Sequence, residues 1–304
     1  GFEVILVDPH RLKTVPGRKT DVIDCQWLQR LHTYGLLAGA FRPAEDIRQL
    51  RSYLRQRSML VQYASRHIQH MQKAMTQMNI KLQHVVSDIT GKTGMDIIQA
   101  IIAGERRPEE LAKFRDYRCK ASEATIVKSL RGHWREEHLF ELTQAVELYT
   151  TYHAKIADCD KRIEALLNTF GDRSDGELPN KSKPKRQQHN APAFDVHGSM
   201  YRVMGVDLTT IDGIDGYTAL KLISEIGLDM MRWPSVKHFT SWLALCPGSR
   251  VTGGKVKSSR TKPSANRAAA ALRLAANSLH RSDSALGAFL RRKKAQLGAP
   301  AAIT

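Results

Sequence analysis

The first residues of the chain are apolar without alternation, since residues 4–7 read Val-Ile-Leu-Val. Such a run is typical of a strand that is covered on both faces of a sheet. A Val-Pro-Gly turn at 15–17 follows, and a helix is expected to begin after Thr20. One strand and one helix cannot bury a sheet. Further strands are therefore expected before Gly1, where the chain is predicted to be cut.

Two long stretches then show the helical spacing of apolar residues. They run from about Pro43 to Leu82 and from about Ser122 to Phe170, with a shorter helical region at Gly94–Phe114 between them. A helix of roughly forty residues spans about 60 Å, so the pattern predicts a coiled-coil arm, either an antiparallel hairpin or one face of a dimer seam. Arginines are expected to take much of the remaining helix surface: Arg48, Arg51, Arg55, Arg57 and Arg66.

The pattern changes again after the second long helix. Residues 171–193 are polar, rich in Pro, Ser and Lys, and without periodicity, which is typical of a flexible linker. Helices are expected beyond it at about Tyr217–Ile226, Ser235–Leu245, Pro263–Leu279 and Ala285–Leu297. The sequence therefore predicts a mainly α protein in four parts: 1–42, 43–170, 171–193 and 194–304.

Charge adds a partner to this picture. The 304 residues carry 47 Lys and Arg against 30 Asp and Glu, a net charge of +17. Such an excess indicates a polyanionic partner, and nucleic acid fits it better than an acidic membrane, since the sequence shows neither a membrane-spanning apolar run nor a signal peptide. The four cysteines lie far apart without metal-ligand spacing, which indicates reduced thiols and a cytoplasmic protein.

Asp21 and Asp24 lie three residues apart and share one face of the first expected helix. Acidic residues in a first turn also stabilise the helix dipole, and this is the usual explanation of an isolated pair. The alternative is that the two carboxylates bind Mg²⁺, a hard cation that takes oxygen ligands, with Lys19 beside them for a phosphate.

Residues 209–227 resemble a helix-hairpin-helix element, with its hairpin at Gly213–Gly216. Free N–H groups at the start of the following helix would bind a nucleic-acid phosphate. An ordinary helical hairpin with glycine caps explains the same pattern equally well.

The most basic region runs from Cys246 to Arg281. Between Arg250 and Lys294 there are twelve Lys or Arg and one acid, Asp283. A glycine pair beside hydroxyls and lysines suits a loop that closely approaches a phosphate backbone, although a basic surface loop without chemistry is the alternative. The predicted nucleic-acid contacts are Lys19, Gly253, Gly254, Lys255, Lys257, Arg260, Lys262, Arg267 and Arg273.

Taken in order, these segments resemble the DEDD-type insertion-sequence transposases, the mobile-element recombinases that are guided by a structured bridge RNA. The resemblance rests on residues 6–9 and 15–37, the long helices, and residues 211–227 and 246–276, and it covers essentially the whole chain. It implies a remnant of an RNase H-like α/β domain at 1–42, a long antiparallel coiled-coil arm at 43–170, a basic linker at 171–193, and a helical transposase domain at 194–304.

The resemblance also implies catalytic roles for three residues. Asp21 and Asp24, preceded by Lys19, match the last two acids of a tetrad that binds Mg²⁺, and the first two acids would lie upstream of Gly1. Thr252 matches a serine nucleophile that forms a covalent link to DNA. A threonine hydroxyl has comparable chemistry but is more hindered and stiffer at χ1.

The partners that the resemblance implies are double-stranded DNA, a structured guide RNA and further copies of the chain, as a dimer or tetramer joined through the helical arms, with no membrane. The expected function is RNA-guided DNA cleavage and strand exchange in the bacterial cytoplasm, at the nucleoid. Both ends look truncated and Thr252 replaces serine, so the activity of this chain stays open. The alternatives are a non-catalytic nucleic-acid-binding coiled-coil protein and a structural coiled coil without nucleic acid.

Overall fold

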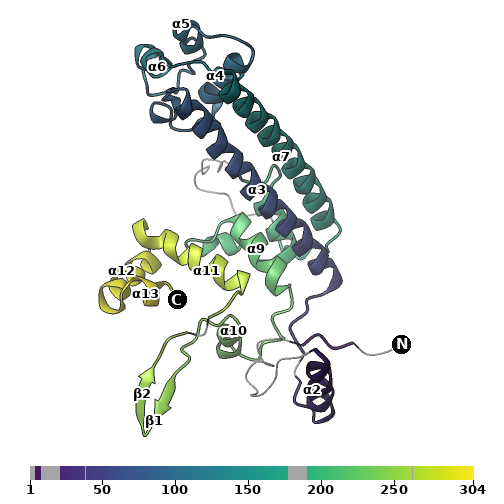
Figure 1. Cartoon of the computed structure of the whole chain (residues 1–304). Helices are drawn as coiled ribbons and strands as arrows, with labels where there is room; N and C mark the ends of the chain where they lie inside the picture. The colour runs from purple at the N-terminus through teal and green to yellow at the C-terminus, as the bar shows by residue number, and fades with distance from the viewer. Residues whose placement is uncertain (1–3, 8–20, 38, 177–189, 262) are drawn as a thin grey trace. The chain divides into compact units, whose positions relative to one another are not determined.

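The computed structural model describes residues 4–7, 21–37, 39–176, 190–261 and 263–304 (Figure 1). The chain falls into two compact units, Gly1–Glu45 and Asp46–Thr304, and each is described by itself. The fold is mainly helical, as predicted, and the described residues contain one sheet, of two strands.

The first unit contains one described helix, α2 at Asp21–Thr33, which begins where the sequence predicts a helix. The predicted buried strand is wrong for residues 4–7. They form a single bridge, to Gly39, and the side chains of Val4 and Leu6 are 83% and 60% exposed. Among the described residues no strand pairs with this segment beyond that bridge, so its apolar side chains stay in solvent. The RNase H-like remnant stays a prediction.

Two long helices run antiparallel in the second unit: α3 at Glu45–Gln77 and α7 at Glu136–Asn168 (Figure 1). The rings of Tyr63 and Tyr152, with centroids 5.8 Å apart, join the middle of the two helices. Apolar faces of both helices are buried against each other within one chain. The supercoil and the dimer seam stay predictions.

Short helices close one end of this hairpin. They are η1 at Leu82–His84, α4 at Lys92–Ile102, α5 at Pro108–Ala112 and α6 at Glu123–Ser129. Their apolar side chains share one hydrophobic cluster with the second half of α3 and the first half of α7. This end of the arm therefore has a core of its own.

The second long helix is shorter than the predicted Ser122–Phe170, because this range forms two helices, α6 and α7, with a break between them. At Gly132 a Cβ would collide with the carbonyl oxygen of Met78, and the N–H of His133 donates to that same oxygen at 2.8 Å. The break follows because the chain must pass this close to the end of α3, where only glycine fits.

Beyond residue 190 the elements are α8 at Val196–Met204, η2 at Leu208–Thr210, α9 at Gly216–Ile226, α10 at Val236–Trp242, β1 at Arg250–Thr252, β2 at Lys255–Ser258, α11 at Arg267–Ser278, η3 at Leu279–Arg281, α12 at Ala285–Leu297 and α13 at Ala299–Ile303. The four helices predicted here are present, whereas α8 and the strands were not predicted. A second hydrophobic cluster joins α8, α9 and α11 to the start of α3 and the end of α7. The three predicted boundaries between the four parts of the chain stay predictions.

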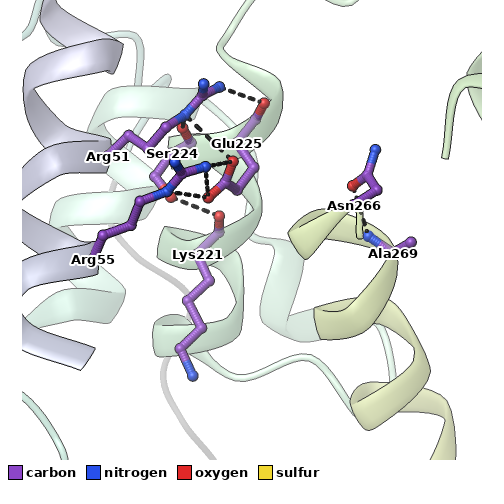
Figure 2. Close-up of polar contacts among 7 residues, drawn as sticks. All are labelled: Arg51, Arg55, Lys221, Ser224, Glu225, Asn266 and Ala269. Carbon is purple, nitrogen blue, oxygen red and sulfur yellow. Dashed lines mark hydrogen bonds and ion pairs between the residues drawn. The ribbon is translucent and has the colours of Figure 1, made fainter. Parts of the chain in front are cut away.

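Arginines of α3 hold the end of α9 (Figure 2). Arg51 donates to the carbonyl oxygens of Ser224 and Glu225 at 2.9 and 3.0 Å, groups that the last turn of a helix leaves unpaired. Arg55 Nη2 lies 2.9 Å from the Glu225 carboxylate. Arg55 is exposed on the helix surface, as predicted, and Arg51 is half-buried. Their partner Glu225 lies far away in sequence and reaches them only in the folded chain.

Arg57 is buried, with 1% of its surface exposed. Its Nε lies 2.5 Å from Asp160 Oδ1 on α7, and its Nη1 donates to the Tyr217 hydroxyl of α9 at 3.1 Å. Burial alone would lower the pKa of Arg57, but the hydrogen bond to Asp160 and the nearby Tyr217 raise it above its ordinary value. A charged guanidinium thus ties both arm helices to α9.

Candidate nucleic-acid interface

A stretch without acidic residues covers the middle of the C-terminal region. Residues 230–282 contain ten Lys or Arg and no Asp or Glu. A cation here has no carboxylate neighbour along the chain, so only folding or a ligand can bring a negative charge to it. The stretch holds α10, both strands and α11.

The two strands of this stretch form a tight ribbon. Gly253 and Gly254 connect β1 to β2 with φ of +56° and +74°, the pair of left-handed conformations that a type I′ turn requires. The glycine pair is therefore the turn of an antiparallel hairpin.

The ribbon, residues 250–258, exposes both faces. Val251 and Val256 are cross-strand partners and are 58% and 65% exposed, and Thr252 pairs with Lys255 beside the turn, where both are exposed. Cross-strand partners lie on one face, so the candidate nucleophile shares a face with a lysine, and two valines take the other face. Sequence reasoning missed these valines, although their alternation around a Gly-Gly pair is the signal of a hairpin.

The predicted phosphate contacts lie on the ribbon and on α11. The described side chains among them are Lys255, Lys257, Arg260, Arg267 and Arg273. All are exposed except Arg273, which is half-buried. Within the described part of the chain no carboxylate lies at ion-pair distance from any of the five. Lys19 and Lys262 lie outside the described residues.

Three aromatic rings precede the ribbon in the chain, and a helix cap follows it. The rings of Trp233, Phe239 and Trp242 contact one another with centroids 5.1–6.2 Å apart. Asn266 caps α11, because its Oδ1 accepts the Ala269 N–H at 3.1 Å (Figure 2), and its Nδ2 donates to the Trp242 carbonyl at 3.5 Å. A hydrogen bond thus joins α10 to the start of α11, the helices on either side of the ribbon in the chain.

Other helices of the protein pack against the glycine hairpin ahead of α9, where a phosphate would otherwise bind. Gly213 has φ +87°, and a Cβ there would lie 2.6 Å from the Ala275 carbonyl oxygen in α11. A Cβ at Gly216 would lie 3.2 Å from the backbone of His197 in α8. The Asp215 carboxylate accepts the Thr218 N–H at 2.7 Å and would repel a phosphate. Of the two interpretations, the geometry favours a packed helical hairpin over a phosphate site.

Beside this hairpin lies a buried polar cluster. His197 Nε2 lies 2.8 Å from Asp207 Oδ1, and the Thr209 hydroxyl donates to the same carboxylate oxygen at 2.7 Å. Burial raises the pKa of Asp207, but its hydrogen bonds to Thr209 and His197 outweigh burial and lower it below the ordinary value. The cluster holds η2 against α8.

Asp21 and Asp24 are the first and fourth residues of α2, in its first turn, as predicted. At these two positions the structure describes the backbone alone. Mg²⁺ is usually held by one or two carboxylates, with water and phosphate oxygens completing its octahedral shell, and two aspartates on one helix face fit such an ion. Among the described residues no group of three or more His, Cys, Asp or Glu could hold a metal. The Mg²⁺ site stays a prediction.

The fold and this surface define a mainly helical protein with an exposed basic ribbon that suits nucleic acid. Residues 207–291, less than half of the chain, match the model of the IS116/IS110/IS902 transposase family. The matched segment includes both strands and Thr252, and it supports an insertion-sequence transposase. Searches of curated proteins and of solved structures found no match. No helix among the described residues is long and apolar enough to cross a membrane.

Proposed function

We propose that this chain is a DNA transposase of the DEDD type, a site-specific recombinase that is guided by a structured RNA and attacks DNA with the hydroxyl of Thr252. The observation that carries the proposal is the position of Thr252, exposed beside the turn of a basic ribbon within the segment that matches the transposase family. A nucleophile for DNA must be accessible to a phosphate, and the exposed Thr252 side chain meets this requirement.

The proposed step is a transesterification. Thr252 Oγ1 bonds to a DNA phosphorus, the bond from that phosphorus to one sugar oxygen breaks, the hydroxyl proton is lost to a base, and the departing sugar oxygen takes up a proton. A phosphothreonine diester to DNA results, and attack by a second DNA hydroxyl reverses it. Lys255, the cross-strand partner of Thr252, binds the attacked phosphate and stabilises its added negative charge.

Asp21 and Asp24 are the residues of this chain that would hold Mg²⁺, with Lys19 beside them. When bound, the ion supplies positive charge to the phosphoryl oxygens and to the leaving oxygen. The phosphate contacts named above orient the duplex, while the arm provides the homo-oligomeric contacts and part of the surface for the guide RNA. Double-stranded DNA, guide RNA and a cytoplasmic, nucleoid-associated location complete the proposal.

One observation favours the rival, a non-catalytic nucleic-acid-binding protein. Thr252 lies in a stretch of more than fifty residues without Asp or Glu, and its hydroxyl has no hydrogen-bond partner among the described residues. A carboxylate that accepts its proton must therefore come from another part of the chain, another copy or a ligand.

Capture of the covalent intermediate tests the proposal. The full chain is expressed in cells that carry the insertion element, the lysate is denatured, and protein-linked DNA is recovered and mapped by mass spectrometry. A nucleotide adduct on Thr252 is expected, lost in Thr252→Ala and retained in Thr252→Ser, with Ser249→Ala as an exposed neighbouring control.

Two results would overturn this assignment. An adduct on Ser249, Ser258 or Ser259 moves the nucleophile. DNA binding without any adduct leaves the rival function.

A further inference from the structure

A ladder of rings lies on the arm, far along the sequence from the ribbon. Tyr152 of α7 contacts Tyr63 and His67 of α3, with centroids 5.8 and 5.3 Å away, and the His67 and Tyr152 planes lie 24° from parallel. His70 continues the series, 5.8 Å from His67. The rings thus pass from one arm helix to the other and end at the exposed side chain of His70.

The ladder ends at a surface cavity of about 260 Å³. Its lining comes from both arm helices: His67, His70, Lys73, Glu141, Gln144, Ala145 and Leu148. Ligand pockets for drug-sized molecules occupy about 300–1,000 Å³, so this cavity has room for one small planar group. Leu148 is 45% exposed at its wall, an apolar side chain that a planar ligand would cover.

The polar groups of the cavity are chemically distinct. Lys73 is exposed, and no carboxylate in the described chain lies within ion-pair distance of it. Glu141 has one carboxylate oxygen 3.4 Å from His138 Nδ1, and Gln144 beside it can both donate and accept. Burial, and then the neighbouring His70, lower the pKa of His67, which favours the neutral ring as a stacking surface.

We propose that this cavity binds an unpaired nucleobase of a single-stranded nucleic acid. The base stacks on the rings of His67 and His70, its amino group donates to Glu141, and an adjoining phosphate contacts Lys73. Stacking on aromatic rings beside a cation is the general way in which single strands are held, and a carboxylate accepts from an exocyclic amino group. The cavity prefers cytosine to uracil, since uracil has no such group.

The inference deepens the proposed function by assigning a second nucleic-acid site, on the arm, for a single strand rather than a duplex. A paired base cannot present its face to a ring, because its neighbours in the duplex cover that face. The strand is either an unpaired part of an RNA or a displaced strand of DNA. Both offer the base ring, the amino group and the phosphate that the cavity is proposed to bind.

Binding of short labelled oligo(C) and oligo(U), each as RNA and as DNA, to the full chain tests this site by fluorescence anisotropy. Oligo(C) is expected to bind more tightly than oligo(U). His70→Ala and Lys73→Gln should each weaken oligo(C) binding about five-fold or more, and Glu141→Ala should remove the preference for cytosine. Both matched controls, Gln69→Ala on α3 and Lys161→Gln on α7, are exposed and lie outside the cavity, and they should bind as the wild type does.

Photocrosslinking with a thiolated pyrimidine then locates the base, with crosslinks expected on peptides that contain His70 or Leu148. Tighter binding of RNA than of DNA identifies RNA as the source of the strand, and equal binding identifies the base alone as the recognised group. Equal affinity of all variants for oligo(C), or crosslinks confined to other parts of the chain, would overturn the site. Such a result leaves the Thr252 adduct unaffected, so the two proposals fail separately.

Discussion

Two sets of cations in this molecule differ in whether a carboxylate pairs with them. On α3, Arg51 and Arg55 meet Glu225 and Arg57 is buried against Asp160. On the ribbon, Lys255 and Lys257 are exposed and have no carboxylate within reach in the described chain. Both sets look alike in the sequence, as basic residues on a surface.

The difference shows which part of the net charge of +17 can bind an anionic partner. A cation paired inside the fold has exchanged its hydration for a protein carboxylate and offers little to a phosphate. A cation that no carboxylate of the fold reaches keeps its full charge available and gains counterion release when DNA binds. The basic charge that matters for binding is therefore the unpaired part of the total.

The largest expected effect comes from breaking the buried pair. Asp160→Ala leaves the Arg57 guanidinium buried without its carboxylate, and we expect the free energy of unfolding to fall by about 3–5 kcal/mol. Urea denaturation followed by circular dichroism measures it. Glu110→Ala, which removes an exposed carboxylate paired with Lys113 at 2.8 Å, is the control, and its expected cost is below about 1 kcal/mol.

The double variant Arg57→Met with Asp160→Leu sharpens the same point. Removing both charges together should recover most of the lost stability, because no unpaired charge then stays buried. Equal costs for Asp160→Ala and Glu110→Ala would show that the Arg57 pair is solvated in solution.

The next largest effect is a difference in stability cost between two glycines with left-handed backbone conformations, Gly213 and Gly253. Gly213→Ala is expected to lower the free energy of unfolding by about 2–4 kcal/mol, from backbone strain together with a clash against the Ala275 carbonyl. Gly253→Ala has nothing within 4 Å of the added Cβ and should cost about 1 kcal/mol from strain alone. A Gly213→Ala protein with unchanged stability and weakened DNA binding would instead restore the phosphate-site interpretation of this hairpin.

The smallest expected effect is on salt dependence. Lys255→Gln and Lys257→Gln should each lower the slope of log K against log salt for duplex DNA by about one, with stability unchanged within about 0.5 kcal/mol. Arg55→Gln, which removes a cation already neutralised by Glu225, should leave the slope as it is. Binding titrations over a series of salt concentrations measure all three, and an equal fall for Arg55→Gln would erase the distinction between the two sets.

Much of the fold could be predicted, because helices depend on local periodicity. The long helices and the helices at α9, α10, α11 and α12 follow from the spacing of apolar residues. The break at Gly132 could not be predicted, because its cause is a contact with Met78. Likewise, the apolar run at residues 4–7 predicts a covered strand, yet what covers a strand is other strands, and its own sequence does not contain them.

The candidate site divides in the same way. Composition alone locates the acid-free stretch at residues 230–282. The spacing of Asp21 and Asp24 marks them as a pair, whereas the choice of Thr252 rests on the resemblance to the transposase family. The two-residue turn at Gly253 and Gly254, which places Thr252 opposite Lys255, required backbone angles and register.

The sequence by itself determined the helical character, the excess of positive charge and the position of the acid-free stretch. Each of these depends only on which residues the chain contains and on their order. Only the tertiary structure decided which cations are free, because a partner such as Asp160 lies more than a hundred residues from Arg57. The ring ladder and its cavity also exist only where α3 and α7 pack together. Electrostatic pairing and stacking act through space, at distances that the order of residues does not record.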